Sequence, residues 1–249
     1  MASAVARLLL DAATPASSGR SSEAMPGWST VRSRRRTWPE RIADAWRDLP
    51  VAPERLVACN VAGDCVREAV QSIAATMQLE PHWFASTLHA AGVANTYDRP
   101  TQLGADRWAA ALGAWRRRHE ACVIVNAGTA LTVDALDDAG QFLGGLIVPG
   151  IHTMLDSLAQ RTAGLARQAG SYRAFPSNTG DAMWTGALDA ALGAVERVRR
   201  RLSDHSGREV VALVSGGGSA LLLAHLDKAL VSPVEHLVLE GLLAFDAER

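Results

Sequence analysis

The stretch ACVIVNAGTALTVDALDDAGQFLGGLIVPG, residues 121–150, decides the fold of this chain of 249 residues. Two β-rich runs, at residues 122–125 and 131–136, flank the segment NAGTA and predict an antiparallel hairpin. The turn DDAG then leads into a further run that contains a glycine pair and ends at a Pro-Gly stop. The stretch therefore predicts three consecutive strands.

Strands and helices alternate on both sides of this stretch. Asp64 is expected to cap a helix, because apolar residues recur after it at helical spacing. The pattern predicts further helices at about residues 107–119, 151–160, 178–202 and 237–245, and further strands at 8–10, 55–63, 82–87, 209–215 and near 231. Alternating elements together with an antiparallel hairpin are typical of an α/β fold with mixed sheets flanked by helices.

The composition argues against several classes of protein. The formal net charge is -1, whereas nucleic-acid-binding domains are usually basic. Lys228 is the only lysine, so the chain has no phosphate-binding lysine of the P-loop kind. Three cysteines fit neither a disulfide framework nor a zinc site and indicate free thiols in a reducing cytoplasm. The apolar run near the N-terminus is too short for a signal peptide or a membrane span, so we expect no membrane partner.

The N-terminal region has one segment without periodicity. Residues 12–38 are rich in Ala, Ser, Gly, Pro and Arg, and they are expected to be irregular. Residues 39–49 then predict a helix with Trp46 on its apolar side.

The loop NTYDRPTQLGADRW, residues 95–108, carries the strongest functional signal. It combines an aromatic residue, a proline, a glycine and an Asp-Arg pair in one short segment. Asp106 is suited to act as a base toward a substrate hydroxyl, and Arg107 offers a planar fork of donors to a carboxylate or phosphate. The alternative is a solvated surface pair, which is common for neighbouring Asp and Arg.

Three turns that follow apolar strands are candidates for phosphate binding, at residues 11–14, 126–129 and 215–219. Glycine lets the backbone approach a phosphate closely, and free N–H groups in such turns bind anions. None of the turns reads GxGxxG, which argues against a Rossmann dinucleotide site. Three such turns in one small chain favour a nucleotide.

The order and spacing of five motifs resemble type III pantothenate kinases. The motifs are YDRPTQLGADRW, NAGTALTVDAL, GGLIVPG, NTGDAMWTGAL and VSGGG, and the resemblance covers roughly residues 55–245. It implies two ribonuclease-H-like domains of the actin-like ATPase superfamily, with residues 1–118 as the N-terminal and 119–249 as the C-terminal domain. It also implies a homodimer that transfers the ATP γ-phosphate to pantothenate, the first step of coenzyme A synthesis, with magnesium and a potassium or ammonium ion.

The resemblance assigns roles on the acceptor side. Asp106 matches the family's general base, which takes the proton from the pantothenate hydroxyl. The substrate-binding positions of the family are matched by Tyr97, Gly104, Ala105, Arg107 and Thr179. Thr179 would contact the substrate from the partner subunit. The alternatives are a packing tyrosine at position 97 and a plain helix N-cap at 179.

On the nucleotide side the resemblance implies contacts from Asp11, Thr14, Gly128, Thr129, Gly216 and Gly217. Asp11 is the candidate magnesium ligand, with a turn-capping aspartate as its alternative. Asn126 stands where many members carry an aspartate that binds the monovalent cation. Asparagine keeps a carbonyl oxygen but lacks the charge, so we expect weaker cation binding.

The first phosphate-binding turn departs from the family pattern DxGN[TS]. This chain reads DAATP: Ala12 and Ala13 follow Asp11, the glycine and asparagine of the pattern are absent, and Pro15 lacks an N–H donor. The sequence leaves two alternative functions open. One is a catalytically weak homologue that acts as a binding or regulatory accessory protein. The other is a related kinase for another small hydroxy acid or sugar.

Overall fold

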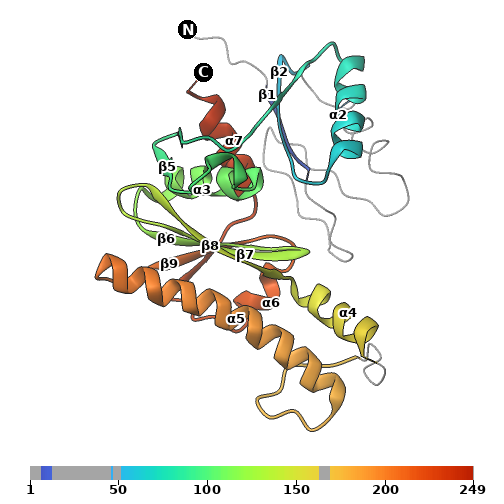
Figure 1. The fold of residues 1–249 in the computed structure, drawn as a ribbon, viewed down its shortest axis with the longest axis vertical. Coiled ribbons are helices and arrows are strands. Elements are labelled where there is room, and N and C mark those ends of the chain that lie inside the picture. Colours follow the sequence, from blue (N-terminus) through green and yellow to red (C-terminus); the bar gives the residue numbers. More distant parts are fainter. Residues whose placement is uncertain (1–6, 13–45, 47–51, 163–168, 249) are drawn as a thin grey trace.

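The structure is a computed structural model that describes residues 7–12, 46, 52–162 and 169–248. The segments expected to be irregular (12–38) or helical (39–49) fall almost entirely outside these residues. In the described ranges the chain forms two sheets with helices between and around them (Figure 1). No helix of these ranges is long and apolar enough to cross a membrane.

The larger sheet is built on residues 121–150, and the predicted strands are confirmed. β6 (Cys122–Ala127), β7 (Ala130–Leu136) and β8 (Gln141–Pro149) are consecutive antiparallel strands. β9 (Val211–Ser215) pairs in parallel with β6, and β10 (Val231–Pro233) pairs in parallel with β9. The sheet is therefore mixed, and its strand order is β10-β9-β6-β7-β8-β5-β4.

The smaller sheet consists of three parallel strands in the described part of the chain. They are β1 (Arg7–Ala12), β2 (Arg55–Asn60) and β3 (Pro81–Trp83), in that order. In this register Asp11 of β1 lies opposite Cys59 of β2. The carboxyl end of β1, where the first phosphate-binding turn begins, is thereby fixed to the sheet.

The helix α2 (Asp64–Thr76) packs beside this sheet. Its predicted cap was wrong by one position: Gly63 is the N-cap residue, and no side chain caps the helix there. Asp64 is the first helical residue instead. Its negative charge still favours the helix, because the N-terminus of a helix carries partial positive charge.

Two short strands connect the smaller sheet to the larger one. β4 (His89–Ala90) and β5 (Val93–Asn95) form a hairpin, and β5 pairs in parallel with β8 at the edge of the larger sheet. The hairpin thus joins the larger sheet although it precedes residue 118, the predicted end of the N-terminal domain. The division into residues 1–118 and 119–249 stays a prediction.

Two helices lie between the sheets, α3 (Ala105–Arg118) and α7 (Leu237–Asp246). They pack with their backbones close together. A Cβ on Gly241 would overlap the carbonyl of Ala109, and one on Gly113 would overlap the carbonyl of Leu237. Because glycine has no Cβ, the two helices can approach this closely. The buried residues of α3 belong to the core that lies between α3 and the larger sheet. This packing fixes the start of α3.

The other face of the larger sheet is covered by α4 (Ile151–Arg161), α5 (Thr179–Ser206) and α6 (Ser219–Leu223). The side chain of Asn178 accepts a hydrogen bond from the Asp181 N–H at the start of α5. The predicted helices here are confirmed, and the asparagine, not Thr179, is the N-cap residue.

Candidate functional site

The start of α3 presents Asp106. Gly104 is the N-cap residue, and Ala105 and Asp106 begin the helix. A Cβ on Gly104 would lie 2.8 Å from Asp106 Oδ1, so the glycine leaves room for this carboxylate. Asp106 Oδ1 also accepts a hydrogen bond of 2.8 Å from the Arg107 N–H. The carboxylate is therefore oriented by its own helix start.

Arg107 is buried beside this carboxylate and paired with Asp134 of β7. Its Nε donates to both carboxylate oxygens of Asp134, at 3.2 and 3.1 Å, and Nη2 donates to Oδ1. Nη1 donates to the hydroxyl of Tyr97 at 3.0 Å. The ring of Tyr97 packs on Phe142 with centroids 5.9 Å apart. The Asp-Arg pair at 106–107 is therefore not a solvated surface pair.

The charges of the Arg107–Asp134 pair persist at neutral pH. Burial raises the pKa of Asp134 to about 6, with a further contribution from Asp106, while the hydrogen bonds and the charge of Arg107 lower it. Burial acts to lower the pKa of Arg107, but its bonds to Asp134 and Tyr97 outweigh this effect and leave that pKa raised. Asp134 is ionised above pH 6 and neutralises a guanidinium that would otherwise be buried without a counter-ion.

Asp11 lies close enough to Asp106 for their charges to interact. Burial, and then the charge of Asp106, raise the pKa of Asp11 to about 7. Burial and these two carboxylates also raise the pKa of the Cys59 thiol. Asp11 Oδ1 is buried and has no hydrogen-bond partner in the described residues. A cation at this point would satisfy that oxygen and offset the repulsion between the carboxylates.

The chemistry of these donors fits magnesium that is also bound by a ligand. In the described ranges no group of three or more His, Cys, Asp or Glu residues is arranged to hold a metal ion. Magnesium in phosphoryl-transfer sites commonly takes only one or two carboxylates and completes its shell with phosphate oxygens and water. A site of this kind needs only one carboxylate from the protein, and Asp11 would be the candidate to supply it.

Two glycine turns meet at the end of the larger sheet. The Gly218 N–H donates to the Ala127 carbonyl at 2.9 Å, which ties the turn after β9 to the turn after β6. Gly216 has φ +93, and a Cβ there would lie 2.6 Å from Asn126 Oδ1 and 2.8 Å from the Ala127 N. Only glycine fits this backbone and this spacing. Gly128, Thr129 and Gly217 are exposed at the same place.

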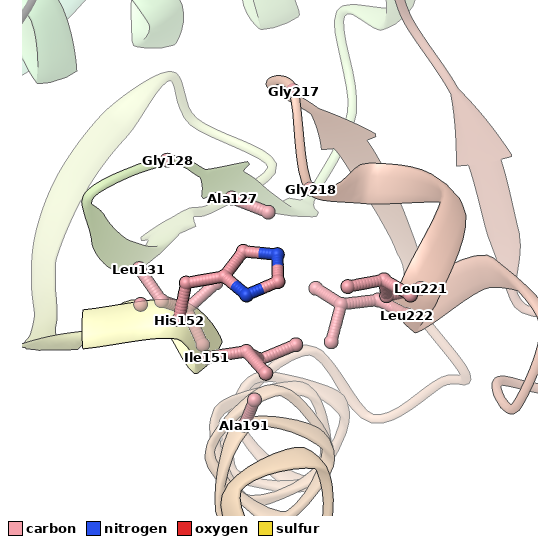
Figure 2. Close-up of a pocket in the computed structure, with 11 residues that line it drawn as sticks. Ala127, Gly128, Leu131, Ile151, His152, Ala191, Gly217, Gly218, Leu221 and Leu222 are labelled. Atoms are coloured by element: carbon pink, nitrogen blue, oxygen red, sulfur yellow. The ribbon is translucent and has the colours of Figure 1, made fainter. Parts of the chain in front are cut away.

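The start of α4 closes this group of turns. The Gly150 N–H and the Thr153 hydroxyl both donate to the Thr129 carbonyl, at 2.8 and 2.7 Å. Behind the turns lies a small pocket, and the ring of His152 points into it between the glycines and the leucines of α6 (Figure 2). The Nδ1 atom of His152 is buried without a hydrogen-bond partner in the described residues.

The structure thus brings the predicted residues into two groups. Tyr97, Gly104, Ala105, Asp106 and Arg107 lie together at and beside the start of α3, and the charge interaction with Asp106 places Asp11 near them. The second group contains Asn126, Gly128, Thr129, Gly216 and Gly217. Strand β7 connects the groups, since it starts beside the glycine turn and carries Asp134 further along.

Two predicted residues do not join these groups. Thr14 lies outside the described residues. Thr179 is the exposed first residue of α5, on the other face of the larger sheet from α3 (Figure 1). The sequence pattern did not single out Asp134, Gly150 or His152. The Pro-Gly stop at residue 150 was a visible signal for the second of these, whereas the other two had none.

Comparisons with known proteins identify the family to which the chain is similar. A sequence model of the family described as type III pantothenate kinase matches residues 18–201. The chain is 42% identical over 216 residues to the type III pantothenate kinase of Paracidovorax citrulli, covering 84% of each chain. It is 40% identical over 203 residues to that of Nitrosospira multiformis, covering 82% of this chain and 77% of the relative.

The fold is also found among solved structures. A Campylobacter jejuni protein assigned to the Baf family of transcriptional activators aligns with a TM-score of 0.56 at 20% identity, over 84% of this chain and 88% of that chain. At this identity the likeness concerns the fold alone. The predicted α/β fold, with mixed sheets and flanking helices, is confirmed.

Proposed function

The chain belongs to the type III pantothenate kinase family, and from this premise we propose that it transfers the γ-phosphate of ATP to pantothenate with Asp106 as the general base. The reaction is the first step of coenzyme A biosynthesis. The observation that carries the proposal is the ordered acceptor side, in which Asp106 stands at a helix start beside a buried, paired arginine.

In the proposed reaction Asp106 accepts the proton of the pantothenate hydroxyl. The hydroxyl oxygen forms a bond to the γ-phosphorus, the bond from that phosphorus to the β–γ bridging oxygen breaks, and ADP leaves. Such transfers depend mainly on alignment and on stabilisation of phosphate charge. The Arg107 N–H fixes one oxygen of Asp106, which supports a constant direction of the base.

Arg107 is proposed to bind the carboxylate of pantothenate. Its Nε and Nη2 groups already donate to Asp134, so the N–H groups that remain are available for an anionic substrate. Tyr97 supports this role, because its hydroxyl accepts from Arg107 while its ring rests on Phe142. Gly104 and Ala105 complete the proposed acceptor loop around Asp106.

The glycine turns are proposed to bind ATP. Gly128 and Thr129 would offer backbone and hydroxyl donors to phosphate, and Gly216 and Gly217 would lie near the nucleoside. Magnesium supplies charge neutralisation when bound, and Asp11 is its proposed ligand because its orphaned oxygen faces no protein donor among the described residues. Asn126 would serve a potassium or ammonium ion through its carbonyl oxygen.

A homodimer is part of the proposal, with Thr179 reaching the substrate of the partner subunit. Thr179 is exposed and lies away from α3 in its own chain, which is the arrangement such a role requires. Phe175, 94% exposed, lies shortly before it and adds apolar surface of the kind that subunit contacts bury.

The direct test is a coupled assay of ADP formation with ATP, magnesium and pantothenate, in the presence of potassium or ammonium. We expect turnover that depends on pantothenate. A pure, folded protein that forms no phosphorylated pantothenate under these conditions would contradict the proposed activity.

A second candidate is an accessory protein with little catalysis, and one observation favours it. The turn after Asp11 lacks the glycine and asparagine of the family pattern, and Pro15 has no N–H, so the first phosphate turn has lost a donor. Calorimetry with a non-hydrolysable ATP analogue separates the two candidates. Pantothenate binding without nucleotide binding would support the accessory protein.

A further inference from the structure

Asp134 is the acidic side chain most deeply placed in the acceptor side, and the proposed reaction does not use it directly. Its exposed fraction is 1%, and that of Arg107 is 6%. Burying two charges costs free energy that their attraction offsets only when the geometry is good. A buried pair beside the proposed base therefore calls for an account beyond stability.

The hydrogen bonds of Arg107 divide its five N–H groups unevenly. Asp134 takes the Nε edge, through Nε and one N–H of Nη2, and Tyr97 takes one N–H of Nη1. Among the described residues, no acceptor is found for the remaining N–H on each of the two terminal nitrogens. This leaves two donors for a ligand, and paired donors of this kind match the two oxygens of a carboxylate.

The surroundings of Asp134 fix the direction of the fork. On the neighbouring strand β8, a Cβ on Gly145 would overlap Asp134 Oδ1, so glycine at this position makes the room for the carboxylate. On the opposite side Tyr97 is held by Phe142, 5.9 Å away between ring centroids. The guanidinium is thus held from the β7 side and from the loop side at once.

We propose that Asp134 is a positioning residue, which holds the Nε edge of Arg107 so that its two remaining N–H groups face the carboxylate of the acceptor. The inference rests on the proposed function, because it assigns the anionic end of pantothenate to Arg107. Preorganised donors bind without reorganising at the moment of reaction, so a loosened Arg107 would weaken the capture of a carboxylate.

The test compares two substrates in one variant. Asp134→Asn keeps a similar shape but places an amide N–H₂ against a guanidinium that has only donors. We expect kcat/KM for pantothenate to fall about 10- to 100-fold, mainly through KM, since small displacements of a substrate clamp have effects of this order. The analogue in which a hydroxymethyl group replaces the carboxylate should lose less than about threefold, because it makes no ion pair with Arg107. The KM for ATP should stay unchanged.

A second comparison covers the case in which the single variant folds poorly. The double variant Arg107→Gln with Asp134→Asn removes both charges, and a neutral pair is tolerated better than half of a broken ion pair. Arg107→Gln alone, which leaves the Asp134 carboxylate without its counter-ion, is the reference for this comparison. We expect the Asp134 change to have no further effect on pantothenate once Arg107 is glutamine.

The outcomes separate the inference from the proposed function. No turnover of either substrate by the wild-type protein would overturn the proposed function. Wild-type turnover with equal losses for pantothenate and its neutral analogue in Asp134→Asn would overturn the positioning role alone. A further loss of kcat/KM for pantothenate when Asp134→Asn is added to Arg107→Gln would also overturn the positioning role alone.

Discussion

The two sides of the site are built in different ways. The proposed acceptor side consists of side chains with charge: Asp106, Arg107 and Asp134 are held by one another and by the start of α3. The proposed nucleotide side consists mostly of backbone, with glycines that permit close approach between turns. Substitutions should therefore act on chemistry and substrate choice at the first side, and on geometry and nucleotide affinity at the second.

The largest expected effect is at Asp106. Asp106→Asn removes the proposed base while keeping the size of the side chain, and we expect kcat to fall by about 100- to 10,000-fold, the usual contribution of a general base. The measurement is kcat under saturating substrates, with circular dichroism to check the fold. Asp98→Asn is the matched control, since Asp98 is an exposed acid of the same loop. Near-full activity of Asp106→Asn would show that the base is elsewhere.

The next effect is on the nucleotide side. Gly216→Ala would place a Cβ 2.5 Å from the Ala127 carbonyl oxygen in a backbone with φ +93. We expect the KM for ATP to rise about tenfold and the free energy of unfolding to fall by about 1–3 kcal/mol, because both the turn and its neighbour must shift. The KM for pantothenate should change little.

Gly193→Ala is the matched control, because a Cβ there has no neighbour within 4 Å and the residue lies inside α5. Alanine in a helix interior should leave activity unchanged and stabilise the protein by about 0.5–1 kcal/mol. If Gly216→Ala behaved like this control, the contrast between a side-chain acceptor site and a backbone nucleotide site would be wrong.

The same contrast explains what the sequence could predict. Asp106 and Arg107 could be proposed as site residues because they are neighbours in a loop of unusual composition. The hairpin of β6 and β7 could be predicted because two β-rich runs flank its turn residues. Asp134 was missed because its partner is 27 residues away, and a single aspartate in an alternating strand resembles a solvent-facing residue. The position of α3 depends on contact with α7, which no local pattern encodes.

Asp11 lies near Asp106, and the pH dependence of stability tests its protonation. Its pKa is raised from 3.8 to about 7, so the folded state binds a proton more tightly than the unfolded state does. Its contribution to stability is full below about pH 4 and is lost as the pH rises through 7. Without magnesium, the melting temperature of wild type relative to Asp11→Asn should therefore fall between pH 5 and 8.

Magnesium should offset the loss of stability that ionised Asp11 causes at higher pH, because it competes with the proton for the same carboxylate. The apparent affinity for magnesium with an ATP analogue should rise by up to about tenfold per pH unit below pH 7 and level off above it. Asp11→Asn should show a flat dependence. Calorimetric titrations at pH 6, 7 and 8 give the comparison, and parallel curves for both proteins would remove Asp11 from the metal site.

The smallest effect is expected at Thr179, which belongs to neither side within one chain. Thr179→Ala removes one hydroxyl at an exposed helix start, so the KM for pantothenate should rise about three- to tenfold, the order expected for one lost hydrogen bond, with the KM for ATP unchanged. Asn178→Ala is the control, since it removes the helix cap and should lower stability more than it changes KM.

A mixing experiment distinguishes a contact across the dimer from one within the chain. An Asp106→Asn protomer lacks the proposed base but keeps Thr179. A Thr179→Ala protomer keeps Asp106 but lacks the threonine hydroxyl. In a mixed dimer with a cross-subunit contact, one of the two sites contains both native residues. Mixing and reassembly should therefore restore the wild-type KM for pantothenate to part of the activity. A mixture that shows only the raised KM of Thr179→Ala would place the hydroxyl in its own subunit's site, and the acceptor side would then be complete within one chain.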